Sequence, residues 1–338
     1  MIEPRAAFEH LFAMTDAIGT FEHADHAEPR PEHGYCTDDV ARVLIAVVRQ
    51  PDPDRALLAL GRTAFRFLVE AQGVAGHIRN RRGVAGRWED RRGVADCWGR
   101  SLWAFGAAAR SASEPWMRQS ALSYFGHGVP LRSPWRRSMA FAALGAADVL
   151  AIAPHHHGAR RLLNDAVATI GPLTDDHGWP WPEARLAYAN AVLPEALLAA
   201  GAALDRPAVV ADGLTLLRWL LERETLDGHL SPTPVGGAGP ADRPPGFDQQ
   251  PIEVAAMADA CARAAEVTGD VAWRLGTECA IRWFAGANDG GAVMWDAQSG
   301  GGYDGLQTGG PNLNQGTEST LALITTLQRA RVPAPATG

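Results

Sequence analysis

The chain has 338 residues, a formal net charge of -7 at pH 7 and 46% hydrophobic residues. This length is enough for one large domain or two modest ones, with a sizeable buried core. The net negative charge argues against a general nucleic-acid binder, because phosphate neutralisation needs clustered Lys and Arg. The basic group Arg79, Arg81 and Arg82 is local, and we predict a solvated loop face for it.

The sequence predicts a cytoplasmic protein without a cofactor. Residues 1–5 lack the basic start and apolar stretch of a secretory signal, and no apolar run of membrane-spanning length is present. Four separated cysteines without paired spacing are typical of free thiols in a reducing compartment. No Walker-type phosphate loop occurs. The residues His23, Asp25, His26 and Glu28 lack a fixed ligand spacing, so we predict no metal site.

Twelve helices are predicted, and they alternate between an amphipathic and a nearly all-apolar type. The first at 4–19 is amphipathic, as is the third at 54–72, where Leu57, Leu60 and Leu68 fall on one side. The second at 37–50 is rich in small and apolar residues and is expected to be buried on most sides. In chain order the remaining helices are expected at approximately 96–111, 114–127, 134–151, 157–171, 190–203, 206–223, 251–267, 270–286 and 316–330.

The connections between these helices predict their arrangement. Those that lead into an apolar helix are long, except the short 128–133; they span 20–36, 73–95, 172–189, 224–250 and 287–315. The opposite connections take only a few residues. If successive helices alternate in direction, all long loops emerge at one end. We therefore predict an all-α (α/α)6 toroid, with an open solenoid as the alternative. Residues 1–332 would form this single domain and 333–338 a disordered tail.

Polar residues gather where the apolar helices begin, so the toroid would carry a polar funnel at its loop end. Glycosidic bond cleavage uses two carboxylates, and we predict catalytic roles among Asp38, Asp39, Asp248 and Glu253. Acids at a helix start can also be caps, and this alternative stays open. Aromatic rings would stack on sugars while polar groups reach their hydroxyls. The predicted substrate-binding residues are Tyr35, Trp88, Asp96, Arg100, Trp179, Trp181, Glu183, Tyr188, Asn190, Gln249, Gln250, Tyr303, Asp304, Asn314, Gln315 and Glu318.

Five strings resemble a bacterial group of (α/α)6-toroid, glycosidase-like proteins that often carry the name glycosyltransferase. They are GYCTDDVAR from Gly34, GHLSP from Gly228, FDQQPIE from Phe247, YDGL from Tyr303 and NQGTEST from Asn314. In that group the toroid stands alone or follows a family 4 type glycosyltransferase. The resemblance runs from about Tyr35 to Leu323 and implies a carbohydrate link. Alanine at position 189 replaces the acid of the group's TYDNA string, so a function that depends on that acid would be altered or lost.

The leading hypothesis is a glycoside-hydrolase-like enzyme that cleaves an oligosaccharide or glycoconjugate. One alternative is a sugar epimerase or an unsaturated-uronide hydrolase on the same scaffold. Epimerases of this shape rely on funnel histidines, so His33, His77 and His177 beside the carboxylates would favour epimerisation. The other alternative is a non-catalytic glycan-binding module that assists a separate glycosyltransferase. No nucleic acid or membrane partner is expected.

Overall fold

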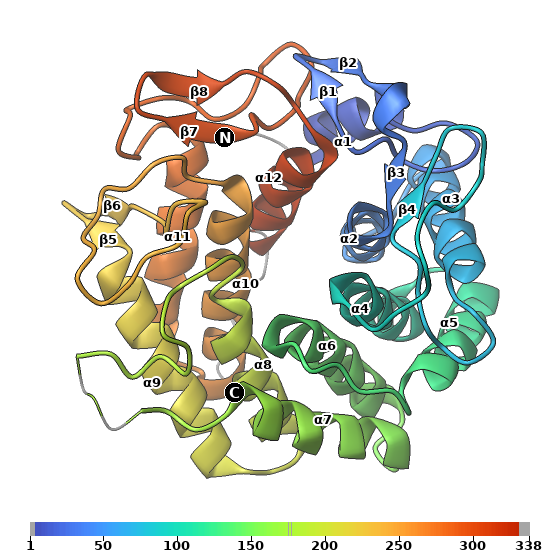
Figure 1. Cartoon of the computed structure of the whole chain (residues 1–338), viewed down its shortest axis with the longest axis horizontal. Helices are drawn as coiled ribbons and strands as arrows, with labels where there is room; N and C mark the ends of the chain where they lie inside the picture. Colours follow the sequence, from blue (N-terminus) through green and yellow to red (C-terminus); the bar gives the residue numbers. More distant parts are fainter. Residues whose placement is uncertain (1–3, 175, 177, 331–338) are drawn as a thin grey trace.

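The helices of the computed structural model, which describes residues 4–174, 176 and 178–330, form two concentric rings (Figure 1). The inner helices are α2 (Thr37–Val48), α4 (Asp96–Ser111), α6 (Arg136–Ile152), α8 (Val192–Ala203), α10 (Pro251–Thr268) and α12 (Thr317–Arg329). The outer helices are α1 (Pro4–Ala13), α3 (Arg55–Ala71), α5 (Pro115–Gly128), α7 (His157–Ile170), α9 (Pro207–Arg223) and α11 (Arg274–Phe284). The predicted (α/α)6 toroid is confirmed.

The ring is closed by contacts between the two ends of the chain. Each inner helix packs against the next, α12 returns to α2, and α1 is the outer partner of α12. The His10 imidazole Nε2 donates to the backbone oxygen of Gln315 (2.8 Å), and the Thr317 hydroxyl donates to that of Phe21 (2.6 Å). The predicted tail 333–338 lies outside the described residues, and the single-domain prediction for 1–332 stays a prediction.

Small residues let two inner helices approach closely. A Cβ atom added to Gly106 of α4 would lie 2.3 Å from the backbone oxygen of Gly145 in α6. A Cβ atom added to Gly145 would lie 2.2 Å from the backbone oxygen of Leu102. Both separations are far shorter than atomic contact allows, so the α4–α6 interface requires glycine at both positions.

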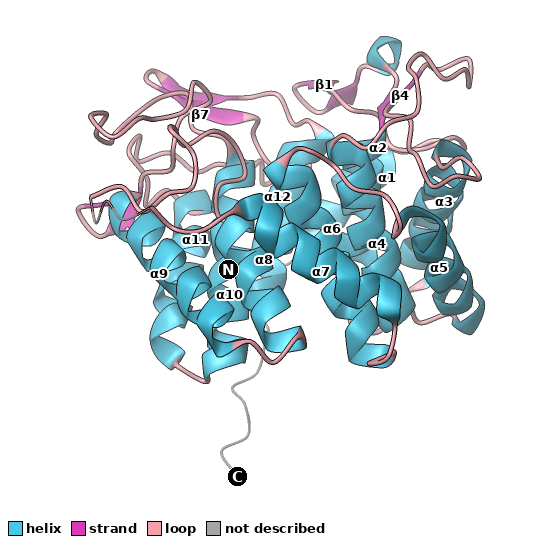
Figure 2. Cartoon of the chain, turned by 60° about the horizontal axis from the view of Figure 1, so that its bottom comes forward, coloured by secondary structure: helices cyan, strands magenta, loops and turns pink. Residues whose placement is uncertain are grey.

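The long loops all lie at one end of the ring, as predicted (Figure 2). They contain short antiparallel strand pairs, which at two or three residues each are too short to give a sequence pattern. The pairs are β1 (Ala24–Asp25) with β2 (Glu28–Pro29), β3 (Tyr35–Cys36) with β4 (Arg81–Arg82), β5 (Thr225–Leu226) with β6 (His229–Leu230), and β7 (Gly305–Gln307) with β8 (Gly310–Asn312). The β3–β4 pair joins the loop after α3 to the start of α2. Two 3-10 turns, η1 (Pro31–His33) and η2 (Val271–Trp273), complete the described elements.

No described helix is both long enough and apolar enough to cross a membrane.

The α4–α6 contact gives a stability prediction. Gly106→Ala should lower the free energy of unfolding by about 1–3 kcal/mol, because the added methyl group forces the helices apart. Gly126→Ala in α5 is the matched control, since its Cβ atom would meet nothing within 4 Å. That substitution should raise stability by about 0.5–1 kcal/mol, because alanine favours the helix. Urea unfolding of both variants checks the prediction, and a Gly106→Ala protein as stable as the wild type would contradict it.

Candidate functional site

A cavity of about 480 Å³ opens at the loop end of the ring, a volume typical of small-molecule sites. Its walls are the first turns of α2, α4 and α12 together with the loop segments before α2, α4, α8, α10 and α12. The lining residues are Glu22, His23, Cys36, Asp38, Asp39, Arg42, Asn80, Arg81, Asp96, Arg100, Tyr188, Val235, Asp248, Gln250, Asp304, Gly305, Gln307, Asn312, Gly316, Glu318 and Ser319. The cavity is therefore strongly polar and rich in carboxylates.

The inner helices begin at this end without side-chain caps. The N-cap residues of the six described inner helices are Cys36, Ala95, Trp135, Ala191, Gln250 and Gly316, and none caps its helix through its side chain. The alternative that Asp38 or Asp96 is an N-cap is therefore wrong. Both lie one or two residues inside their helices. Their carboxylates face the cavity and are stabilised there by the positive ends of the helix dipoles.

Two arginines and a glutamate form the floor of the cavity. Arg42 binds Glu318 (Nη2 to Oε2, 2.7 Å) and lies near Asp39 (Nη1 to Oδ1, 3.4 Å). Arg42, Arg100 and Glu318 also line a second, mostly apolar space of about 60 Å³ on their other side. This lower space has room for only a few water molecules. Ala189, where the resembling group carries an acid, lines it and is buried.

The charges around the floor give the carboxyl groups of Asp39 and Glu318 very different pKa values. Burial raises the pKa of Asp39 to about 8; Arg42 opposes this rise, and Glu318, Glu22 and Asp38 add to it. Burial acts in the same direction on Glu318, but the guanidinium groups of Arg42 and Arg100 hold its pKa below the usual value. At neutral pH the site therefore holds a protonated Asp39 close to an ionised Glu318. Carboxyl groups whose pKa values are pushed apart by their surroundings are typical of sites of acid–base chemistry.

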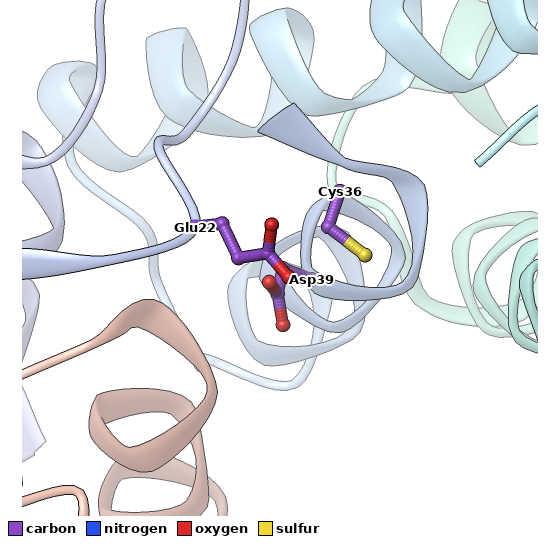
Figure 3. Close-up of side chains that lie close together, drawn as sticks. All are labelled: Glu22, Cys36 and Asp39. Carbon is purple, nitrogen blue, oxygen red and sulfur yellow. The ribbon is translucent and has the colours of Figure 1, made fainter. Parts of the chain in front are cut away.

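Glu22, Cys36 and Asp39 place three ligand-type atoms within 4.8 Å of one another (Figure 3). Arg81 already forms an ion pair with the Glu22 carboxylate, and Arg42 lies beside Asp39. Burial, with Asp39 and Asp38 nearby, raises the pKa of the Cys36 thiol well above its usual value, so the sulfur stays protonated. Arginines therefore already balance the acidic groups of the cluster, and its sulfur is protonated, so the cluster does not fit a cation site.

The structure brings nine of the predicted site residues to the cavity. They are Asp38, Asp39, Asp96, Arg100, Tyr188, Asp248, Gln250, Asp304 and Glu318. Eleven others do not line it, and these are Tyr35, Trp88, Trp179, Trp181, Glu183, Asn190, Gln249, Glu253, Tyr303, Asn314 and Gln315.

Glu253 differs most from its predicted catalytic role. Its carboxylate is 4% exposed and accepts the backbone N–H groups of Ala189 and Asn190, the latter at 3.1 Å. The Asn190 amide donates a third hydrogen bond to it at 3.2 Å. Burial, then the nearby Glu224, raises the pKa of Glu253 to about 8, although these N–H donors oppose the rise. Glu253 is placed to hold the turn that follows Tyr188, and not to touch a ligand.

A second contact fixes the same segment from α6. Arg137 binds both carboxylate oxygens of Glu183, at 2.8 and 2.9 Å, and the side-chain oxygen of Asn190 at 3.0 Å. It also donates to the backbone oxygen of Tyr188. Glu183 and Asn190 are thus occupied by the protein itself, and their effect on the cavity is to position Tyr188.

The predicted tryptophan platform is packed into the protein. Trp179 and Trp181 are both buried against Trp219, with ring centres 5.1 and 5.9 Å away. Trp88 packs against Phe67 at 5.3 Å. Both indoles belong to the hydrophobic core beneath the loops. Neither Trp179 nor Trp181 therefore presents an open ring face to a sugar.

Several predicted polar contacts are also made within the protein. The Tyr35 hydroxyl donates to Asp16 (2.6 Å), and the Gln249 amide donates to Asp289 (2.5 Å). Gln315 accepts from Ser299 (2.5 Å), and Asn314 accepts from the backbone of His26 (3.0 Å). The half-buried Tyr303 packs against the core. These groups organise the loops around the cavity.

Sequence reasoning missed most of the lining that the loops supply. Among the missed residues Arg81 was expected on a solvated loop face, yet it lines the cavity and pairs with Glu22. It reaches this place because β4 pairs with β3, which sets Arg81 opposite Cys36. The other missed polar lining residues are Glu22, His23, Cys36, Arg42, Asn80, Gln307, Asn312 and Ser319. Only Arg42 and Ser319 had a usable signal, since each lies in the first turns of a predicted inner helix.

No sequence family and no curated protein matches the chain. Solved structures do match its fold. A sugar epimerase from a ruminal bacterium has a TM-score of 0.71 at 11% identity, with 98% of this chain and 99% of that chain covered. A cellobiose 2-epimerase from Spirochaeta thermophila has a TM-score of 0.68 at 11% identity, with 96% of each chain covered. A family 76 α-mannanase from Bacteroides thetaiotaomicron has a TM-score of 0.66 at 10% identity, covering 97% of this chain and 94% of that one.

The Glu253 contacts predict a structural effect. Glu253→Ala should lower the free energy of unfolding by about 2–4 kcal/mol, because it leaves buried N–H donors without an acceptor. Asp248→Ala is the control, since Asp248 is half-buried and, within the part of the chain that the structure describes, its carboxylate accepts one hydrogen bond, from the Gln307 amide at 3.3 Å. Its stability should change by less than about 1 kcal/mol. Chemical denaturation measures both, and equal stability of the two variants would refute the positioning role.

Proposed function

We propose that the protein is a hydrolase that cleaves a glycosidic bond in a neutral oligosaccharide or glycoconjugate. The observation that carries this proposal is the gathering of seven carboxylates, from helix starts and loops far apart in the sequence, around one cavity. Glycoside hydrolysis needs one carboxyl group that gives a proton to the leaving oxygen and a second that acts on water or on the anomeric carbon.

Asp39 is the proposed proton donor, because its raised pKa keeps it protonated at neutral pH. Asp248 is the proposed second carboxylate. The remaining lining carboxylates are engaged by an arginine, a hydroxyl or a backbone N–H: Glu22 by Arg81, Asp38 by Arg100, Glu318 by Arg42, Asp96 by Ser138 and Asp304 by Gly316. Among the described residues the Asp248 carboxylate accepts a hydrogen bond from the Gln307 amide alone, so we assign it to the activation of water.

The charge of the lining supports a neutral substrate. Seven carboxyl groups, of which Asp39 is the proposed protonated one, face three arginines, namely Arg42, Arg81 and Arg100. An anionic sugar would therefore meet net repulsion in the cavity. This balance argues against the unsaturated-uronide alternative, whose substrate carries a carboxylate.

Sugar epimerisation is the second candidate, favoured by the end-to-end fold similarity to sugar epimerases. Among the described residues His23 supplies the one imidazole that lines the cavity. His33 lies beside it, with ring centres 5.1 Å apart, but is exposed outside the lining. His77 is not in the lining, and His177 lies outside the described residues. The association with a separate glycosyltransferase stays a prediction.

Activity assays test the proposal. Asp39→Asn and Asp248→Asn should each lower kcat by roughly 100- to 10,000-fold on any neutral oligosaccharide that the wild type cleaves, because each removes one acid–base step. Both should keep a melting temperature near that of the wild type. Arg62→Lys, in an exposed pair with Glu114, is the control with unchanged turnover. Full activity of Asp39→Asn would rule out its role as the donor.

The pH dependence gives an independent check. A proton donor must be protonated, and Asp39 loses its proton as the pH rises through about 8. The value of kcat/KM should therefore fall above pH 8, by up to about tenfold per pH unit. A kcat/KM that is flat from pH 7 to pH 10 would contradict the assignment.

The product distinguishes the candidates. Hydrolysis releases new reducing ends, whereas epimerisation in deuterated water incorporates deuterium at the inverted carbon and leaves the glycosidic bond intact. Release of reducing sugar supports the hydrolase. Deuterium incorporation without cleavage would show that the protein is an epimerase and would overturn the hydrolase proposal. Binding measured by calorimetry without either product would indicate a glycan-binding module.

A further inference from the structure

Four buried polar atoms at the floor of the cavity have no hydrogen-bond partner within the described residues. They are Nε and Nη1 of Arg42, Nη2 of Arg100 and Oδ1 of Asp38. Arg42 is already paired with Glu318 through its Nη2, which leaves Nη2 of Arg100 as a donor and Oδ1 of Asp38 as an acceptor beside each other. Arg100 is only 3% exposed, and its guanidinium carbon lies 3.8 Å from the centre of the Phe141 ring, which fixes its orientation. Buried polar atoms in folded proteins are nearly always paired, so these two atoms indicate a place where a ligand or solvent supplies the partners.

The two atoms belong to one close pair of side chains. Nε of Arg100 lies 3.7 Å from Oδ1 of Asp38. The other Asp38 oxygen, Oδ2, accepts the Cys36 thiol at 3.7 Å, so Oδ1 is the oxygen left for a ligand. The floor thus offers a carboxyl oxygen as acceptor and a guanidinium N–H as donor side by side.

This pair selects the chemistry of its ligand. Two neighbouring hydroxyl groups on a sugar ring match it, because one can donate to Asp38 while the other accepts from Arg100. An anion would suit Arg100 but be repelled by Asp38, and an ammonium group would suit only Asp38. A vicinal diol is therefore the best match.

The depth of the cavity adds a second constraint. Arg100, Arg42 and Glu318 separate it from a lower space of about 60 Å³, which is too small for another sugar ring. A ring whose hydroxyls reach Asp38 therefore has no room for a further ring beneath it. We propose that the Asp38–Arg100 pair anchors two adjacent hydroxyls of a terminal sugar ring, so that the enzyme acts from a chain end. This inference rests on the proposed function and adds that the substrate is bound through a terminal sugar ring.

Product analysis tests the chain-end action. The probes are hexasaccharides of β-1,4-linked mannose, β-1,4-linked glucose and α-1,4-linked glucose, with and without a fluorescent label on the reducing end. If the enzyme acts from the non-reducing end, the early labelled products should be shorter than the probe by one fixed unit. If it acts from the reducing end, the labelled probe should be inert while the unlabelled probe is shortened stepwise. A spread of labelled lengths at early conversion would overturn this inference and leave hydrolysis standing. Failure to cleave any probe would count against the proposed function instead.

Binding tests the anchor without any need for turnover. Mannose, glucose and their 2-, 3- and 4-deoxy analogues are titrated calorimetrically into the wild type, Asp38→Asn, Arg100→Lys and the control Arg62→Lys. For the wild type and the control, loss of an anchored hydroxyl should weaken binding by roughly 10- to 100-fold, as expected for a hydrogen bond to a charged group. Asp38→Asn should remove most of this difference, because the anchor is already lost.

The outcomes are separable. Asp38→Asn is isosteric, so it keeps the test valid even where Arg100→Lys lowers the melting temperature. A deoxy-sugar penalty of equal size in Asp38→Asn and the wild type would overturn the anchor. A penalty that vanishes in Asp38→Asn and persists in Arg62→Lys supports it, whichever reaction the enzyme performs.

Discussion

The structure depends on one electrostatic balance, the compensation of many carboxylates gathered at one end of a helical ring. Carboxylates crowded into a partly buried cavity repel one another and lose hydration. The positive ends of the inner helices and the guanidinium groups of Arg42 and Arg100 offset this cost. Because the inner helices begin without side-chain caps, their first-turn acids are available to a ligand. The (α/α)6 arrangement thereby turns the beginnings of helices into a polar site.

The same balance divides the acidic residues by role. Carboxylates that are held by backbone N–H groups, as Glu253 is, shape the walls of the cavity. Arg42 and Arg100 hold the pKa of Glu318 below its usual value, although burial opposes them. Asp39 keeps its proton because it is buried among other acids. These acidic residues lie at similar positions near the beginnings of inner helices. Their pKa values and contacts differ because their surroundings differ.

The ring could be predicted from the sequence because it rests on local signals, namely helix periodicity and the alternation of short and long connections. Parts of the site could be predicted for the same reason, since Asp38, Asp39 and Glu318 lie in the first turns of predicted helices. The partners within the loops could not. The sequence around Trp181 and Glu253 is equally consistent with a ligand contact and with the packing that occurs, and β3–β4 pairing depends on residues far apart in the chain.

The closure of the ring by its first and last helices has a consequence for biosynthesis. The hydrogen bonds from His10 to Gln315 and from Thr317 to Phe21 join residues that are 305 and 296 positions apart in the sequence. Glu318, which pairs with Arg42, is also supplied by the last helix. A nascent chain on the ribosome therefore carries α2 with Arg42 lacking this partner until α12 has been synthesised. The floor of the cavity is complete only once α12 has packed against α2.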